Sequence, residues 1–235
     1  MKSRSDRTLA GLVARGRPTP VAHTGQLPEP GSFVTADAAG SPLLVVRQDD
    51  GSVRVLANVC RHRGARVETE PSGRRKMFAC PYHRWCYTRT GAIRSIPFDD
   101  GFAGAGRAEL GLVEHCSAQA GNLVWVVPDR TVPPEVGVPD QIGRAALLRA
   151  GTLELGAPWA GIEARIKADA TALAPGTFVR WPGPYAEVIS VRPAGPRLDR
   201  TAVGFWLLAA APGVGAQDAG AHWDQRTAWL LGACR

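Results

Sequence analysis

The sequence predicts a mainly β protein with two domains, and three features of the chain indicate this. Residues 32–130 contain many short β-rich runs separated by frequent turns, which is typical of a small antiparallel β domain. Residues 128–146 contain four prolines and read as a linker. Residues 147–235 contain further strand patterns and end in a helical pattern, so we expect a small α+β domain there.

Within the first domain, the clearest expected element is a hairpin. The run 52–57 alternates apolar residues and follows the run 42–47 across a turn that contains Asp50-Gly51, a dipeptide typical of tight hairpins. Before this domain, residues 8–15 are predicted to form a short helix. The Gly- and Pro-rich residues 16–31 are predicted to be extended, with His23 at the surface. Other expected strands are 32–35, 76–79, 85–87, 90–93 and 121–127.

The second domain is expected to combine strands with one C-terminal helix. Residues 161–168 alternate in the manner of a strand, although less clearly than the runs near them. The expected strands are 147–155, 161–168, 177–181, 186–191 and 201–208. The residues predicted to share the core face of the helix are Trp223, Thr227, Leu230, Leu231 and Cys234.

Composition excludes several classes of protein. The 235 residues carry a net charge of +7, but the basic residues form no stripe of the kind that binds nucleic acid. No stretch approaches the roughly 20 apolar residues of a membrane span. The five cysteines are scattered and odd in number, so they predict no disulfide framework. We therefore expect a reduced, cytoplasmic protein, whose basic surface could attract an acidic redox partner.

The chemistry of the chain is concentrated in two short segments. Cys60-Arg61-His62 and Cys80-Pro81-Tyr82-His83 each supply one thiolate and one imidazole. A structural zinc site also takes two Cys and two His, but usually draws two Cys from one loop and two His from a helix. A Rieske [2Fe–2S] centre has two Cys on one iron and two His on the other, so each loop must give a mixed pair. The mixed pairs favour the Rieske centre over zinc.

The flanking residues extend this interpretation. Cys60-Arg61-His62-Arg63-Gly64 and residues 80–87, with Gly91 and Ile96-Pro97 beyond, closely resemble the Rieske domain of aromatic-ring-hydroxylating oxygenase α subunits. That family usually has Gly after the second His, where this chain has Arg84. Respiratory Rieske proteins carry an additional Cys in each loop, at positions occupied here by Ala65 and Tyr82. The resemblance therefore implies the oxygenase type and a [2Fe–2S] cluster held by Cys60, His62, Cys80 and His83.

The resemblance also implies how the chain is divided. A Rieske domain over residues 20–130 and a linker over 131–146 would precede a remnant of the oxygenase catalytic (helix-grip) domain over 147–235. That catalytic domain normally holds a mononuclear iron through two His and one carboxylate. Of the five histidines, His62 and His83 are assigned to the cluster, and no pair has helical spacing. We predict that this chain has no facial triad of its own, and that His222 either lies on a helix surface or shares a metal with another subunit.

Details around the cluster give three further expectations. One of Trp85 and Tyr87 is predicted to pack under the cluster, and Cys86 to be a core thiol. The resemblance implies that the hydroxyl donors of respiratory proteins are missing, which predicts a potential at the lower end of the Rieske range. The positive charge of Arg84 is expected to favour the reduced cluster.

Two roles follow from the resemblance. The chain is expected to be a one-electron transfer component of an oxygenase system, with a ferredoxin or flavin reductase as donor and an oxygenase catalytic subunit as acceptor. The alternative is an oxygenase α-type enzyme that hydroxylates an organic or aromatic substrate, with its metal site completed by a partner chain. Whether the chain is an enzyme by itself stays open at this stage. Homo- or hetero-oligomers are expected by resemblance.

Overall fold

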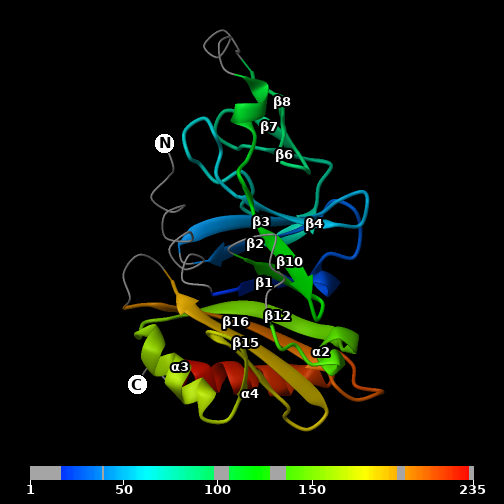
Figure 1. Cartoon of the computed structure of the whole chain (residues 1–235), viewed down its shortest axis with the longest axis vertical. Helices are drawn as coiled ribbons and strands as arrows, with labels where there is room; N and C mark the ends of the chain where they lie inside the picture. The colour runs from blue at the N-terminus through cyan, green and yellow to red at the C-terminus, as the bar shows by residue number, and fades with distance from the viewer. Residues whose placement is uncertain (1–16, 39, 98–105, 128–135, 195–198, 233–235) are drawn as a thin grey trace. The chain divides into compact units, whose positions relative to one another are not determined.

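The computed structural model describes residues 17–38, 40–97, 106–127, 136–194 and 199–232. It is mainly β, with antiparallel sheets and a few helices, which confirms the predicted fold class (Figure 1). The helix predicted at 8–15 and the residue Cys234 lie outside the described residues. No helix in the described part is long and apolar enough to cross a membrane.

Contacts divide the chain into two compact units, which are described separately. One unit contains Gln26–Asp37 and Pro42–Ser117, and we call it the loop unit. The other contains the residues up to Gly25, Ala38–Ser41 and Ala118–Arg235, and we call it the helix unit. The predicted ranges 20–130, 131–146 and 147–235 stay a prediction. Of the expected linker, residues 131–135 lie outside the described residues, and Asp140–Arg144 form the short helix α2.

The loop unit is built from two antiparallel sheets. One has the order β5-β2-β3-β4-β9, and the other has the order β6-β7-β8. In the first, Leu43 pairs with Ala57 and Arg47 with Val53, so the predicted hairpin around Gly51 is confirmed. The bounds are β2 Ser32–Ala38, β3 Ser41–Arg47, β4 Val53–Ala57, β5 Ser72–Arg74, β6 Met77–Ala79, β7 Cys86–Thr88, β8 Ile93–Ser95 and β9 Glu114–His115, with the 3-10 helix η3 at Arg107–Leu110.

The core of the loop unit lies directly under the two Cys-His segments. Phe33 meets Phe78 edge to face, with ring centroids 5.6 Å apart. Both Cys60 and Cys80 belong to this core. Burial alone does not mark a cysteine as a ligand, because free cysteines are commonly buried as small apolar residues. Its buried members are Phe33, Leu44, Val46, Leu56, Cys60, Val67, Phe78, Cys80, Trp85, Tyr87, Ile96 and Leu112.

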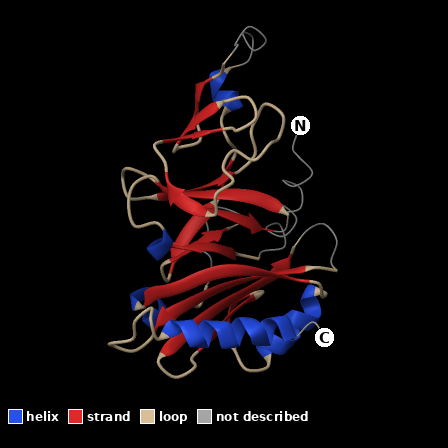
Figure 2. Cartoon of the chain, turned by 180° about the vertical axis from the view of Figure 1, so that it is seen from behind, coloured by secondary structure: helices blue, strands red, loops and turns tan. Residues whose placement is uncertain are grey.

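The helix unit contains a three-stranded sheet, β1-β11-β10, and a five-stranded antiparallel sheet, β12-β16-β15-β14-β13. Helices α3 and α4 lie on the same face of the five-stranded sheet (Figure 2). The bounds are β1 Thr19–His23, β10 Ser117–Ala120, β11 Leu123–Val126, β12 Ala146–Leu155, β13 Thr171–Ala174, β14 Thr177–Arg180, β15 Tyr185–Pro193, β16 Thr201–Ala209, α2 Asp140–Arg144, α3 Trp159–Lys167 and α4 Ala219–Gly232, with the 3-10 helix η1 at Thr24–Gln26.

The central strands of this sheet are buried along almost their whole length. Every residue of β15 is buried, and so is every residue of β16 except Ala209. Both faces of these strands are therefore covered, which explains their nearly continuous apolar sequence. Polar side chains inside them, such as Glu187 and Arg192, need partners to be tolerated there.

Three expectations from the sequence are wrong. Residues 161–168 are not a strand, because Ile162 and Ile166 lie four residues apart on the buried face of α3, which begins after Pro158. Leu231 is 52% exposed, whereas its neighbour Leu230 is fully buried, so the core face of α4 is narrower than expected. His23 is buried in β1 and is not at the surface.

Candidate metal centre

The two Cys-His segments fold into loops with the same backbone pattern. In the first loop, Cys60 N–H donates to the Ala65 carbonyl at 2.8 Å, and Gly64 N–H donates to the Cys60 carbonyl at 2.9 Å. In the second, Cys80 N–H donates to the Trp85 carbonyl at 2.9 Å, and Arg84 N–H donates to the Cys80 carbonyl at 2.9 Å. Each loop therefore closes on its own cysteine, with donors and acceptors at equivalent positions.

The fifth position of each loop turns the chain back through the left-handed region of the backbone. Gly64 has φ of 77° and Arg84 has φ of 60°. A residue with a Cβ is strained by about 1 kcal/mol in this region, whereas glycine enters it freely. The geometry explains why glycine suits this position in similar proteins. Arg84 is thus a departure in backbone conformation as well as in charge.

The loops place the two predicted cysteine ligands in the buried core and the two predicted histidine ligands beside each other. Cys60 and Cys80 are 3% and 1% exposed, and the rings of His62 and His83 lie edge to face with centroids 4.5 Å apart. The Nδ1 atoms of both imidazoles are buried, and that of His83 has no hydrogen-bond partner among the described residues. A buried ring nitrogen that lacks a partner fits a metal ligand, because coordination would satisfy it.

The electrostatics of the donors also fit a metal. Burial raises the pKa of the Cys60 thiol, and the adjacent Cys80 thiol raises it further. Burial and the neighbouring His83 lower the pKa of His62, which disfavours the protonated imidazole. Thiolate ligands need a cation to stabilise them in such a site, and imidazole ligands must be unprotonated. The donor set therefore fits a positively charged metal centre.

A Rieske cluster and a single zinc ion would need different arrangements of these four donors. Within the part of the chain that the structure describes, no three His, Cys, Asp or Glu side chains gather around one point in the manner of a mononuclear site. A tetrahedral zinc ion would need all four donors at about 2.0–2.3 Å from one centre. In a Rieske cluster, each iron needs only two protein ligands, so the four donors need not surround a single centre.

Two aromatic residues after the second loop pack against the ligands. The indole of Trp85 stacks on the His62 ring, with centroids 5.1 Å apart and planes 6° from parallel. The hydroxyl of Tyr87 lies 3.2 Å from the Cys60 sulfur and accepts the Arg61 N–H at 3.1 Å. Both aromatics therefore support the site, where one was expected. The expectation that hydroxyl donors are missing is wrong, because it considered the loops alone and Tyr87 reaches Cys60 from strand β7.

A buried asparagine fixes the first loop to its frame, and the sequence pattern did not identify it. The Asn58 side-chain oxygen accepts N–H groups of Val67 and Glu68 at 3.0 and 2.9 Å, and its amide donates to the Glu68 carbonyl at 2.7 Å. These three bonds join the residues just before and just after the Cys60 loop. A polar residue two positions before a ligand was the only signal that could have pointed to it.

The remaining histidines and thiols lie elsewhere. His23 accepts the Gly25 N–H at 3.0 Å through Nδ1, and His115 is in β9 opposite Val55. His222 lies on α4, but the expectation of a helix-surface residue is wrong, because it contacts the buried Glu187 at 2.7 Å. The half-buried Cys86 donates its S–H to the Arg84 carbonyl at 3.3 Å.

Comparison with known proteins agrees with this geometry. Residues 17–105 match the family model of the Rieske [2Fe–2S] domain. The chain thus contains a Rieske [2Fe–2S] domain, and the cofactor of that domain is a [2Fe–2S] cluster. Under this identification, the ligand loops lie within the matched residues.

Its relatives narrow the class. The large oxygenase component of the naphthalene 1,2-dioxygenase system of Pseudomonas putida is 35% identical over 127 residues, which are 53% of this chain and 28% of the relative. The α subunit of biphenyl 2,3-dioxygenase of Rhodococcus jostii (strain RHA1) is 39% identical over 112 residues, or 47% and 24%. The chain thus spans about a quarter of the length of these relatives. Over this region the chain is similar to the large or α subunits of ring-hydroxylating dioxygenases.

Solved structures of Rieske oxygenases are similar in fold to nearly the whole chain, including the helix unit. A quaternary ammonium Rieske monooxygenase superposes with a TM-score of 0.75 at 17% identity, covering 97% of this chain and 80% of that chain. A naphthalene 1,2-dioxygenase from Rhodococcus sp. superposes with a TM-score of 0.65 over 96% of this chain and 74% of that chain. The helix unit therefore has the fold of part of a Rieske oxygenase, as predicted.

Proposed function

We propose that this chain is an electron-transfer component of an oxygenase system, whose cluster is held by Cys60 and Cys80 on one iron and by His62 and His83 on the other. The observation that supports the proposal is that two loops with the same backbone pattern supply two buried thiols and two adjacent imidazoles. When bound, the cluster supplies one-electron transfer at a potential raised by its neutral histidine ligands.

The residues of the chain set the environment of that electron. Trp85 and the buried core beneath the cysteines exclude water from one side of the site, and Tyr87 donates its hydroxyl proton toward the Cys60 sulfur. Both imidazoles are half exposed, so the electron would enter and leave through their outer edges. Burial of one side and exposure of the other give the site a single direction of exchange.

The surface around the imidazoles favours an acidic partner. Within residues 60–66 and 80–84, the exposed charged side chains are those of Arg61, Arg63, Arg66 and Arg84, with no acidic residue among them. Arg66 is partly neutralised by Asp37 at 3.5 Å, which leaves three arginines at the loop tips. Such a surface would steer an acidic donor, a ferredoxin or a flavin reductase, toward the imidazole edges.

The proposed acceptor is the mononuclear iron of an oxygenase catalytic subunit. The three histidines that the cluster does not use lie on β1, β9 and α4. Their contacts include that of His23 with the Gly25 N–H and that of His222 with Glu187. None of these contacts leaves a pair of imidazoles facing a common point. We therefore assign the catalytic iron to another chain, in a homo- or hetero-oligomer located in the cytoplasm.

A second candidate is an oxygenase α-type enzyme that hydroxylates an organic or aromatic substrate, with its metal site completed in trans. The relatives favour it, because one is the large oxygenase component of a dioxygenase system and the other is a dioxygenase α subunit. The fold supports it as well, since the superposition on a Rieske monooxygenase includes the helix unit. The two candidates differ in the number of irons per chain.

Anaerobic purification with iron and sulfide quantitation, followed by low-temperature EPR of the reduced protein, tests the proposal. We expect about two irons and two sulfides per chain and a Rieske-type signal. We also expect no hydroxylation until a catalytic subunit is added. A third iron with oxygen-dependent product formation would favour the second candidate. Zinc in place of iron would refute both.

A further inference from the structure

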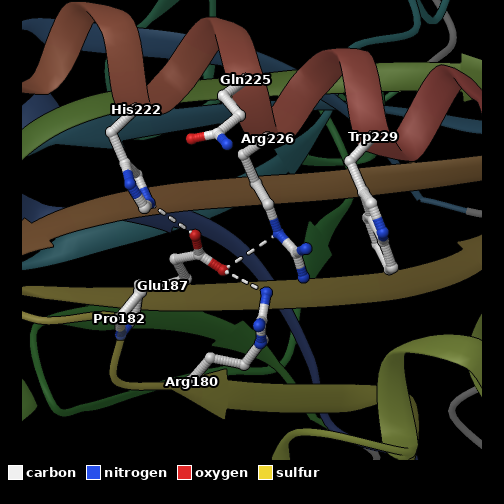
Figure 3. Close-up of a pocket in the computed structure, with 7 residues that line it drawn as sticks. All are labelled: Arg180, Pro182, Glu187, His222, Gln225, Arg226 and Trp229. Atoms are coloured by element: carbon white, nitrogen blue, oxygen red, sulfur yellow. Dashed lines mark hydrogen bonds and ion pairs between the residues drawn. The ribbon is translucent and has the colours of Figure 1, made fainter.

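The most heavily buried charge in the helix unit belongs to Glu187 on strand β15. Its side chain is fully buried, and it contacts three basic groups (Figure 3). Oε1 lies 2.7 Å from His222 Nε2, and Oε2 lies 3.1 Å from Arg226 Nε and 3.3 Å from Arg180 Nη1. Contacts of this kind are required to hold a carboxylate inside a protein.

One face of α4 and two strands enclose a cavity beside this carboxylate. On the helix, the lining side chains recur at intervals of three and four residues, so they project in the same direction (Figure 3). The cavity has a volume of about 200 Å³. Its lining residues are Arg180, Pro182, Glu187, His222, Gln225, Arg226 and Trp229.

Arg226 has a donor that the protein leaves unused. The residue is 8% exposed, and its Nη2 is buried with no hydrogen-bond partner among the described residues. Glu187 contacts the guanidinium at Nε, and the guanidinium carbon lies 3.9 Å from the centre of the Trp229 ring. Burial lowers the pKa of Arg226 despite the adjacent Glu187, so its surroundings compensate the charge incompletely. A buried charged donor without an acceptor is costly, and a ligand could supply the acceptor.

The charges that line the cavity favour an anion. In the lining, two guanidinium groups face one carboxylate, and Arg180 also pairs with the half-exposed Asp169 at 2.6 Å. The buried Nη2 of Arg226 is therefore the charged donor that a ligand could use. A singly charged anion would match this one donor, whereas a doubly charged phosphate would carry more charge than one guanidinium. The remaining walls, Pro182 and Trp229, offer apolar surface for a carbon skeleton.

We propose that this pocket binds a small organic carboxylate, with the ligand oxygen accepting from Arg226 Nη2 and its carbon part packing on Trp229. The exposed Gln225 also lines the pocket and offers a further amide donor. Glu187 acts as a positioning residue, because it orients both guanidinium groups. The proposal does not depend on the role assigned to the cluster, since all of these residues belong to the helix unit.

Isothermal calorimetry of the full chain with its cluster bound tests the charge requirement directly. The probes are benzoate and benzamide, which share shape but differ in charge. We expect benzoate to bind at least about tenfold more tightly, as a charge-assisted hydrogen bond predicts. Equal affinity for the two probes, or no benzoate binding at concentrations up to about 50 mM, would overturn the proposal.

A pair of variants locates the binding. Arg226→Gln should weaken benzoate binding by about tenfold or more. The matched control Arg200→Gln, which removes an exposed arginine paired with Glu154 on the same sheet, should leave it unchanged. Unaltered binding by Arg226→Gln would contradict the assignment. Should that variant fail to fold, the comparison of benzoate with benzamide on the unmodified chain decides the matter alone.

Discussion

The Tyr87 hydroxyl lies 3.2 Å from the sulfur of Cys60 while accepting the Arg61 N–H at 3.1 Å. Because its oxygen already accepts one hydrogen bond, the tyrosine is free to donate its own proton to the sulfur. Burial, together with the contact to Cys60, raises the pKa of Tyr87, so the proton is retained at all pH values of interest. A hydrogen bond to a thiolate ligand stabilises the more negative, reduced cluster.

Tyr87→Phe is therefore expected to lower the midpoint potential. A difference of roughly 1 kcal/mol between the redox states would correspond to roughly 40 mV. Protein-film voltammetry or a spectroscopic redox titration measures it. Tyr82→Phe is the matched control, because Tyr82 is 65% exposed and touches His83 only with its ring. Equal potentials for Tyr87→Phe and the unmodified protein would show that the hydroxyl does not donate.

The equivalent positions of the two loops allow a reciprocal test of backbone strain. Arg84→Gly should stabilise the protein by about 1 kcal/mol or slightly less, because glycine enters the left-handed region without strain but is more flexible when unfolded. Gly64→Ala should destabilise it by about 1 kcal/mol, since the added Cβ would meet no atom within 4 Å and only strain remains. Denaturant titrations of both variants measure the effects. We expect the free energy of unfolding to rise for Arg84→Gly and to fall for Gly64→Ala; changes of the same sign would contradict the prediction.

The charge of Arg84 gives a separate prediction for the same variant. Loss of a positive charge should disfavour the reduced cluster and lower the midpoint potential. For a hydrated charge roughly 10 Å away, the change is on the order of 20 mV. The side chain is exposed, so the change should shrink as salt is added. An unchanged or higher potential at low salt would count against an electrostatic role for Arg84.

Buried His23 predicts a loss of stability in mild acid. Burial lowers its pKa from 6.5 to about 4. Between these two pH values, His23 is protonated in the unfolded chain and neutral in the folded chain. Stability is therefore fully present above pH 6.5 and falls as the pH drops toward 4, by about 2 kcal/mol at pH 5. His23→Asn keeps an acceptor for the Gly25 N–H and does not titrate. We expect the pH dependence of the unfolding free energy to be shallower in this variant by that amount.

Glu187 predicts the largest effect on stability. Among the described residues, Glu187 supplies the carboxylate that contacts Arg226, and Glu187→Gln removes its charge from beside a buried guanidinium. The expected cost is about 3–5 kcal/mol, as measured when one partner of a buried pair is removed. Glu154→Gln is the control, because its pair with Arg200 is more than half exposed and should be worth less than about 1 kcal/mol. Similar costs for the two variants would refute a central role for Glu187.

The sequence was sufficient for the features that depend on neighbours along the chain. The spacing of Cys60, His62, Cys80 and His83 predicted a two-loop iron–sulfur site, and the Asp50-Gly51 turn predicted the hairpin that leads into it. It failed for α3, where a short alternating pattern concealed the four-residue spacing of Ile162 and Ile166. Short apolar runs satisfy strand and helix patterns almost equally well, so only packing could decide between them.

Tertiary structure alone decided the contacts between distant elements. Tyr87 meets Cys60 across 27 positions of sequence, and His222 meets Glu187 across 35. A single sequence contains no local pattern for such pairs, because their proximity arises from the pairing of strands and the packing of a helix on a sheet. The sequence by itself determined which metal chemistry the chain can perform. The fold determined which hydroxyl lies beside Cys60, and which buried carboxylate lies beside the cavity on α4.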